Sequence, residues 1–152
     1  MTFIQTDLET ILGYLNQLNS DQKAQWGSMS AQRMVEHLTD TLRIATGKNP
    51  QALLVPEEKL DKMLAFLGSD KPMAQDIQVP FATPEMALRH DEIELAIDEF
   101  VEEWLEFEEL YDQNPEHREV HPYYGALNRE QWERLHAKHL THHFTQFGLI
   151  QA

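Results

Sequence analysis

Apolar residues recur at three- and four-residue intervals in four long segments of the chain, a spacing that places them on one face of an α-helix. A fifth, shorter pattern lies within a long crossover from Pro50 to Pro80. We therefore predict helices over Asp7 to Asn19, Ser30 to about Gly47, Leu60 to Leu67, Thr83 to about Tyr111, and Asn128 to Phe147.

Residues at the segment ends agree with these boundaries. Ser30 offers a capping oxygen, and Thr83 followed by Pro84 is a typical helix start. Asn128 with Gln131 three residues later forms a capping-box pattern, and Gly148 marks the end of the last helix. The polar stretch 113–126 carries two prolines and a glycine, and it is predicted to be a loop.

With four long helical patterns and no convincing strand, the sequence predicts an all-α protein. The expected architecture is a four-helix bundle with a long crossover between its second and third helices. A length of 152 residues fits one domain, so residues 1–152 are predicted to form a single bundle domain.

The composition narrows the classes of function. Lys and Arg number 12 against 26 Asp and Glu, and the resulting formal charge of −14 repels nucleic acids and anionic membranes. Cysteine is absent, so metal chemistry would fall to histidine and carboxylate, and a cytoplasmic location is expected. Neither a leader segment nor a membrane span is expected. Most of the net negative charge falls in the segment 83–111, whose acidic residues are predicted to form a solvated face.

Four of the eight histidines lie within one eight-residue window of the last helix. Helical periodicity puts His136, His139 and His143 on the apolar face, whereas His142 is expected at its flank or in solvent. The four-residue spacing of His139 and His143 places two imidazoles one turn apart, so that both can reach a single cation. Inward histidines that only pack in the core remain the alternative.

A cation between helices needs a third protein ligand. His37, at the shoulder of the apolar stripe of the second helix, could point toward the last helix. Three neutral imidazoles suit a divalent transition metal such as zinc, nickel or iron. His117 and His121 precede the last helix and are predicted to lie at the surface, with a place at the mouth of the site as the alternative.

Two parts of the sequence resemble a known family. The segment 26–38 (WGSMSAQRMVEHL) looks like the second helix of the DinB-like superfamily. The segments 121–132 (HPYYGALNREQW) and 135–148 (LHAKHLTHHFTQFG) resemble an uncharacterised branch of the same superfamily. The matching segments cover about a third of the chain and lie at both ends of the expected bundle.

The resemblance implies a three-histidine metal site with one ligand on the second helix and two, four residues apart, on the last. These positions correspond to His37, His139 and His143. Gln146 matches a recurring position that could orient a ligand. The resemblance also implies homodimers, and relatives include thiol-dependent transferases. The extra histidines leave His136 open as a substitute for His37.

The leading hypothesis is a metal-dependent enzyme, a hydrolase or a thiol-dependent transferase, that acts on a small-molecule substrate with a thiol cofactor as one option. A non-enzymatic metal-binding or ligand-binding bundle is the competing class, and a metal-free structural bundle is the third. Asp40, one turn after His37, is a candidate acid–base partner.

Overall fold

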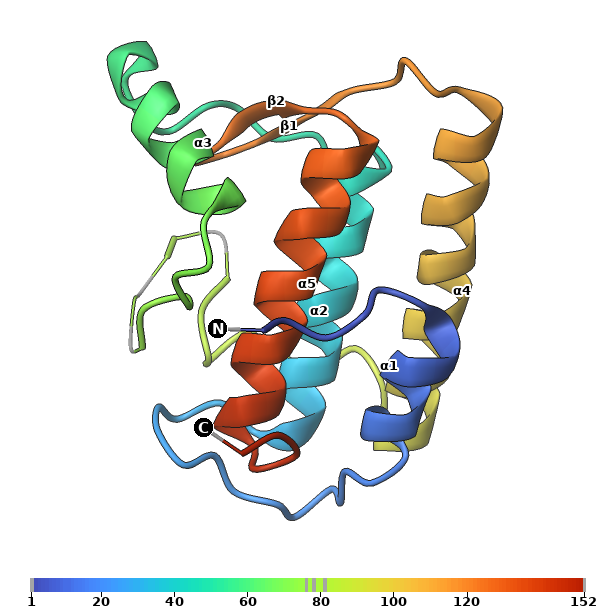
Figure 1. The fold of residues 1–152 in the computed structure, drawn as a ribbon. Coiled ribbons are helices and arrows are strands. Elements are labelled where there is room, and N and C mark those ends of the chain that lie inside the picture. Colours follow the sequence, from blue (N-terminus) through green and yellow to red (C-terminus); the bar gives the residue numbers. More distant parts are fainter. Residues whose placement is uncertain (1, 76, 78, 81, 152) are drawn as a thin grey trace.

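The computed structural model describes residues 2–75, 77, 79–80 and 82–151, and residues 1, 76, 78, 81 and 152 lie outside this description. The described chain is mostly helical, with one small antiparallel sheet (Figure 1). Its α-helices are α1 (Leu8–Leu15), α2 (Ala31–Ala45), α3 (Leu60–Gly68), α4 (Ile93–Gln113) and α5 (Arg129–Gln146). A 3₁₀ turn, η1 (Glu57–Lys59), precedes α3, and the strands are β1 (Glu119–His121) and β2 (Gly125–Leu127).

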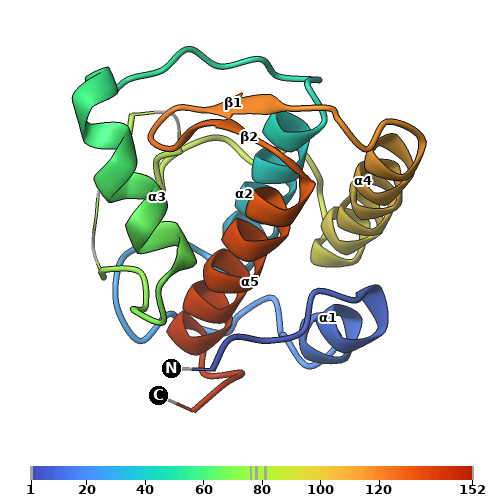
Figure 2. The ribbon, with the colours of Figure 1, turned by 45° about the horizontal axis from the view of Figure 1, so that its top comes forward.

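Helix α2 packs against both α4 and α5, and α1 packs against α4 (Figures 1 and 2). Their facing sides bury one hydrophobic cluster, in which Trp104, Phe100, Trp132 and Phe144 are among the largest fully buried side chains. Burying such aromatic side chains is the main favourable contribution to folding. None of the described helices combines the length and the apolarity that a membrane span requires.

Helix α3 lies on the other side of α5 (Figure 2). Two basic side chains of α5 hold its C-terminal end. Lys138, which is 1% exposed, donates to the carbonyl groups of Phe66 and Lys71. Arg134 donates to the carbonyl groups of Leu67 and Ser69. The last carbonyls of a helix lack partners within the helix and carry partial negative charge, so these cations fix α3 as a wall facing α5.

The predicted helix ends are confirmed at most positions. The Ser30 hydroxyl accepts from the Arg33 backbone N–H, and Asn128 and Gln131 form a complete capping box. Gly148 follows α5 with φ +74°, a conformation that glycine adopts without strain. Helix α1 ends at Leu15, earlier than the predicted Asn19.

The prediction that the third long helix begins at Thr83 and Pro84 is wrong, because α4 begins at Ile93. Side chains of α2 bind the backbone before that point. Glu36, which has no exposed surface, accepts from the backbone N–H groups of Arg89 and His90, and Gln32 donates to the His90 carbonyl at 2.6 Å. These tertiary hydrogen bonds take the place of the helical ones, and they override the local start signal.

The loop predicted between the last two long helices contains the two short strands. Residues Glu119 to His121 pair antiparallel with Gly125 to Leu127, and Gly125 takes φ +82° at the turn. The hairpin contacts both α2 and α5 and lies across the end of α2 (Figure 1). It therefore brings His121, the last residue of β1, next to side chains of α3 and α5.

The acidic face of α4 is not wholly solvated as predicted. Glu103 is 6% exposed and accepts from Lys48 at 2.9 Å and from Arg43 at 3.2 Å. Two cations compensate the cost of burying this carboxylate. Glu99 likewise pairs with Arg89, so part of the acidic face ties α4 to its neighbours.

Candidate metal centre

His37 reaches the site from the middle of α2. It lies two turns after the Ser30 cap, and its side chain turns toward α5, where its Nε2 atom lies 2.8 Å from Nε2 of His139. His37 is 8% exposed, and its Nδ1 atom is buried without a hydrogen-bond partner among the described residues. His37 therefore points toward α5, as predicted.

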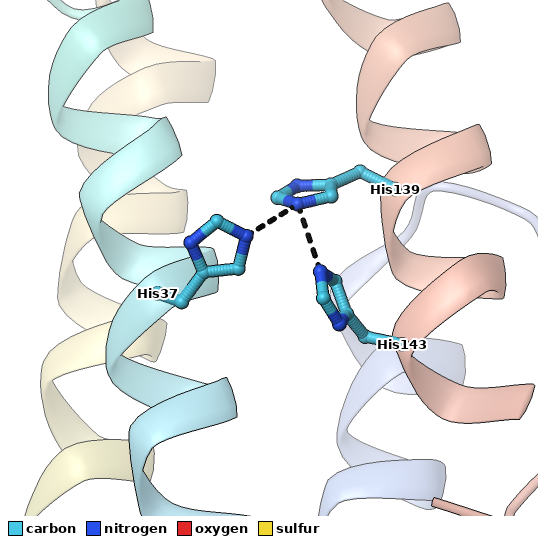
Figure 3. A group of neighbouring side chains, drawn as sticks. All are labelled: His37, His139 and His143. Atoms are coloured by element: carbon cyan, nitrogen blue, oxygen red, sulfur yellow. Dashed lines mark hydrogen bonds between the residues drawn. The ribbon is translucent and has the colours of Figure 1, made fainter. Parts of the chain in front are cut away.

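His139 and His143 extend from consecutive turns of α5 and meet His37 at one point (Figure 3). The Nε2 atoms of His139 and His143 lie 3.1 Å apart, and the ligand atoms of all three residues lie within 4.8 Å of one another. Two imidazole nitrogens on one tetrahedral zinc ion lie roughly 3.4 Å apart. The three histidines are thus close to the spacing at which they could hold one ion.

The orientation of the His143 ring follows from its neighbours. The Gln146 side-chain amide donates to the Trp26 carbonyl at 3.0 Å, which directs its Oε1 atom to His143 Nδ1 at 2.7 Å. Because Oε1 can only accept, Nδ1 of His143 carries the proton, and its Nε2 atom presents a lone pair to the other two rings. Gln146 therefore lies behind a candidate ligand, in the position that the resemblance implies.

Protons alone satisfy this cluster poorly. His139 Nε2 is close to both His37 Nε2 and His143 Nε2, and the latter can only accept. A single proton on His139 Nε2 points at one of the two neighbours, and the same nitrogen cannot then accept from the other, so one of the two close contacts lacks a hydrogen bond. A cation between the rings accepts all three lone pairs at once, and the donor set therefore fits a metal ion.

The electrostatics keep the three rings in the neutral form that binds metals. Burial, with the nearby Arg33 charge as the second cause, lowers the pKa of His37 to about 3. Burial and the repulsion from neighbouring histidines hold the pKa values of His139 and His143 well below the usual 6.5. At neutral pH the rings are uncharged, so a cation does not have to displace the extra proton of an imidazolium.

The histidines open into a cavity of about 440 Å³ between α2, α3, α5 and the hairpin. Met63 and Phe66 of α3 form one wall, and Leu135 of α5 forms another. Volumes of this size are typical of small-molecule sites. A molecule in the cavity would contact the side chains that could hold the ion.

The two remaining histidines of α5 lie on either side of the cluster. His142 is half-buried at the cavity, with its ring edge-on to Trp26 at 5.6 Å between centroids, so it lies at the flank as predicted. His136 is 3% exposed and packs among Trp104, Phe107 and Trp132. It is not one of the three clustered residues, so the cluster contains His37 and not His136.

The surface interpretation is wrong for His121. This residue is 7% exposed, lines the cavity, and accepts from the Tyr123 backbone N–H through Nδ1 at 3.0 Å. Burial lowers its pKa to about 4. His117 instead lies 2.8 Å from the Glu119 carboxylate outside the cavity.

Two tyrosines of the hairpin were not predicted as site residues, although both line the cavity. Tyr123 and Tyr124 follow His121 in the sequence, and burial raises the pKa of Tyr124 to about 12, so its hydroxyl stays protonated. The segment 121–132 was singled out by the family resemblance, which was the one sequence signal for these tyrosines. The strands that direct the segment inward have three residues each, too few to show the alternation of apolar and polar residues that predicts a strand.

Asp40 does not serve as an acid–base partner in this arrangement. Its carboxylate pairs with Arg33 at 3.4 Å and with Arg89 at 2.7 Å, and it does not line the cavity. Among the residues that the structure describes, the cavity lining contains no Asp or Glu side chain. Proton transfer there would fall to histidine or tyrosine.

Comparison with known proteins identifies one family. A family model described as "Protein of unknown function (DUF1569)" matches residues 1–148, a range that includes all three clustered histidines. Neither the curated proteins nor the solved structures gave a match. The comparisons do not test the DinB-like resemblance, which stays a prediction.

Proposed function

The chain belongs to the DUF1569 family, and we propose that it is a metal-dependent enzyme that holds one divalent transition metal on His37, His139 and His143. The observation that carries this proposal is the convergence of three histidine rings beside a cavity. His139 Nε2 lies 2.8 Å from His37 Nε2 and 3.1 Å from His143 Nε2, and the ligand atoms of all three lie within 4.8 Å of one another. An aromatic or aliphatic core would have filled this position at lower cost, since buried polar rings must find partners.

The donor set defines the chemistry that the site supports. Three imidazoles suit zinc, nickel or iron, and they leave coordination positions open for other molecules. Bound there, a divalent ion supplies a Lewis acid and lowers the pKa of a coordinated water or thiol. Neutral ligands leave the full charge of the ion in place, which favours an anionic partner.

Hydrolysis and thiol transfer are the two reaction classes that we propose for this site. His142 is our candidate for moving the proton. Its ring lines the cavity beside His143, and burial lowers its pKa, so it is a neutral base at pH 7. A hydrogen bond to the Met73 backbone occupies one side of the ring and fixes its orientation.

We also propose that the fold is a four-helix bundle of DinB-like type, with α1, α2, α4 and α5 as its helices and α3 within the crossover between α2 and α4. The arrangement of one candidate ligand on α2 and two, four residues apart, on α5 supports this assignment. The homodimer that the resemblance implies belongs to the same proposal.

A non-enzymatic binding protein is the second candidate function. One observation favours it: among the described residues, no carboxylate lines the cavity and could act as a general base. A protein that only stores or carries a metal or a small ligand would need no such group.

An activity panel separates the two candidates. Protein loaded in turn with zinc, nickel and ferrous iron is tested on esters, amides, lactones and thiol-transfer pairs. An enzyme gives turnover that His139→Ala abolishes and that His117→Ala, a histidine outside the cavity, preserves. Metal-loaded protein that turns over no member of the panel supports the binding protein instead.

A further inference from the structure

The cavity beside the histidines is lined mainly by apolar side chains from several parts of the chain. Met63 and Phe66 come from α3, Leu135 from α5, and Met29 and Met73 from the segments before α2 and after α3. Methionine side chains are flexible and polarisable, and they adapt to apolar ligands of different shape. These walls gain free energy by covering an apolar molecule.

Formal charge is kept out of this cavity. The chain has 26 Asp and Glu and 12 Lys and Arg, yet within the described ranges none of these side chains lines it. A ligand with several charged groups would lose its hydration there without gaining ion pairs, which is costly. One anionic group is the exception, because the ion on the three histidines would neutralise it.

We infer that the cavity binds a small molecule with an extended apolar body and a single metal-binding anionic head group. This inference rests on the proposed metal site and specifies the substrate class for it. The head group coordinates the ion at His37, His139 and His143, and the apolar body lies against Met63, Phe66 and Leu135. A peptide-like thiol with two carboxylates and an ammonium group does not belong to this class, whereas an apolar thiol or carboxylate does.

A hydroxamate series tests the inference by binding instead of activity. Cobalt-loaded protein is titrated with butyryl, hexanoyl and octanoyl hydroxamates, and binding is followed by calorimetry and by the visible spectrum of cobalt. We expect affinity to rise roughly fourfold for each added methylene group, the ratio that follows from burying one CH₂. Suberic monohydroxamate, which has the octanoyl chain ending in a carboxylate, should bind at least about tenfold more weakly than octanoyl hydroxamate.

The two proposals fail in different ways. A chain that takes up no cobalt overturns the metal site. A chain that takes up cobalt but binds the three alkyl hydroxamates equally, or binds the suberic compound as tightly as the octanoyl one, overturns the apolar cavity alone. Metal content measured after each titration shows that the hydroxamate has not removed the ion.

A charge placed in the wall provides a second test. Met63→Arg should weaken octanoyl hydroxamate at least about tenfold and strengthen suberic monohydroxamate, because the new cation faces the end of the chain. Leu105→Arg adds the same charge on α4 at a side chain that is 52% exposed and outside the cavity, and it should change neither affinity. Equal effects of the two substitutions would contradict the assignment.

Discussion

His143 Nδ1 lies 2.7 Å from Gln146 Oε1, and the same glutamine donates to the Trp26 carbonyl. This chain of contacts joins the segment before α2 to a candidate ligand on α5. The two residues are three apart on one helix, so their contact follows from helix geometry. The consequence is a His143 ring whose proton and orientation are set before a metal binds.

Removal of the Gln146 amide should weaken metal binding while keeping the fold. In Gln146→Met the His143 ring loses its acceptor, and we expect the dissociation constant for zinc to rise about 10- to 100-fold. Competition with a chromophoric chelator measures this constant. Gln113→Met, at an exposed residue of α4, is the matched control and should leave it unchanged. Equal zinc affinity in both variants would show that Gln146 does not support the ligand.

The buried His136 should make the metal-free protein less stable in acid. Burial lowers its pKa in the fold to about 3, whereas an unfolded histidine has a pKa of about 6.5. Below pH 6.5 the unfolded state therefore binds a proton that the folded state does not bind. The free energy of unfolding consequently decreases as the pH is lowered.

The measurement is urea unfolding of metal-free protein between pH 7 and pH 4, wild type against His136→Phe. Phenylalanine fits the aromatic surroundings of Trp104, Phe107 and Trp132 and cannot take a proton. Below about pH 6 we expect the slope of unfolding free energy against pH to fall by up to about 1.4 kcal/mol per pH unit in the variant. Identical slopes in the two proteins would contradict a neutral buried His136.

Glu36 should be a major determinant of stability although it lies outside the cavity. It accepts from the backbone N–H groups of Arg89 and His90 and from the Gln32 side chain, with no exposed surface. Glu36→Ala leaves these donors buried without an acceptor, so we expect a loss of about 2–4 kcal/mol in unfolding free energy. Glu102→Ala, at an exposed position of α4, should cost less than about 0.5 kcal/mol. A small effect at Glu36 would mean that the segment before α4 is held by other contacts.

The sequence predicted the helical class and the clustered pair His139 and His143 because both depend on periodicity within a helix. Four residues separate His139 from His143, and a stripe of apolar residues shows which way α5 faces. His37 was harder to place, since it lies at the edge of its stripe, and the resemblance to a known family supplied the choice.

The errors occurred where tertiary contacts decide the local structure. The Thr83–Pro84 start signal fails because Glu36 and Gln32 hold the backbone at residues 89 and 90 in a non-helical form. His121 was predicted at the surface because nothing in its own segment shows that a hairpin turns it inward. Both local structures depend on contacts with residues that are distant in the sequence. A single sequence does not show which distant residues are in contact.

Metal content is the measurement that tests the central claim most directly. Protein purified without a histidine tag is reconstituted with zinc, nickel or ferrous iron, desalted and analysed for bound metal, alongside His37→Ala, His143→Ala and His142→Ala. We predict about one ion per chain in the wild type and in His142→Ala, whose ring lies beside the cluster but outside it, and loss of the ion in the other two. Wild-type protein that retains none of the three metals would contradict the account.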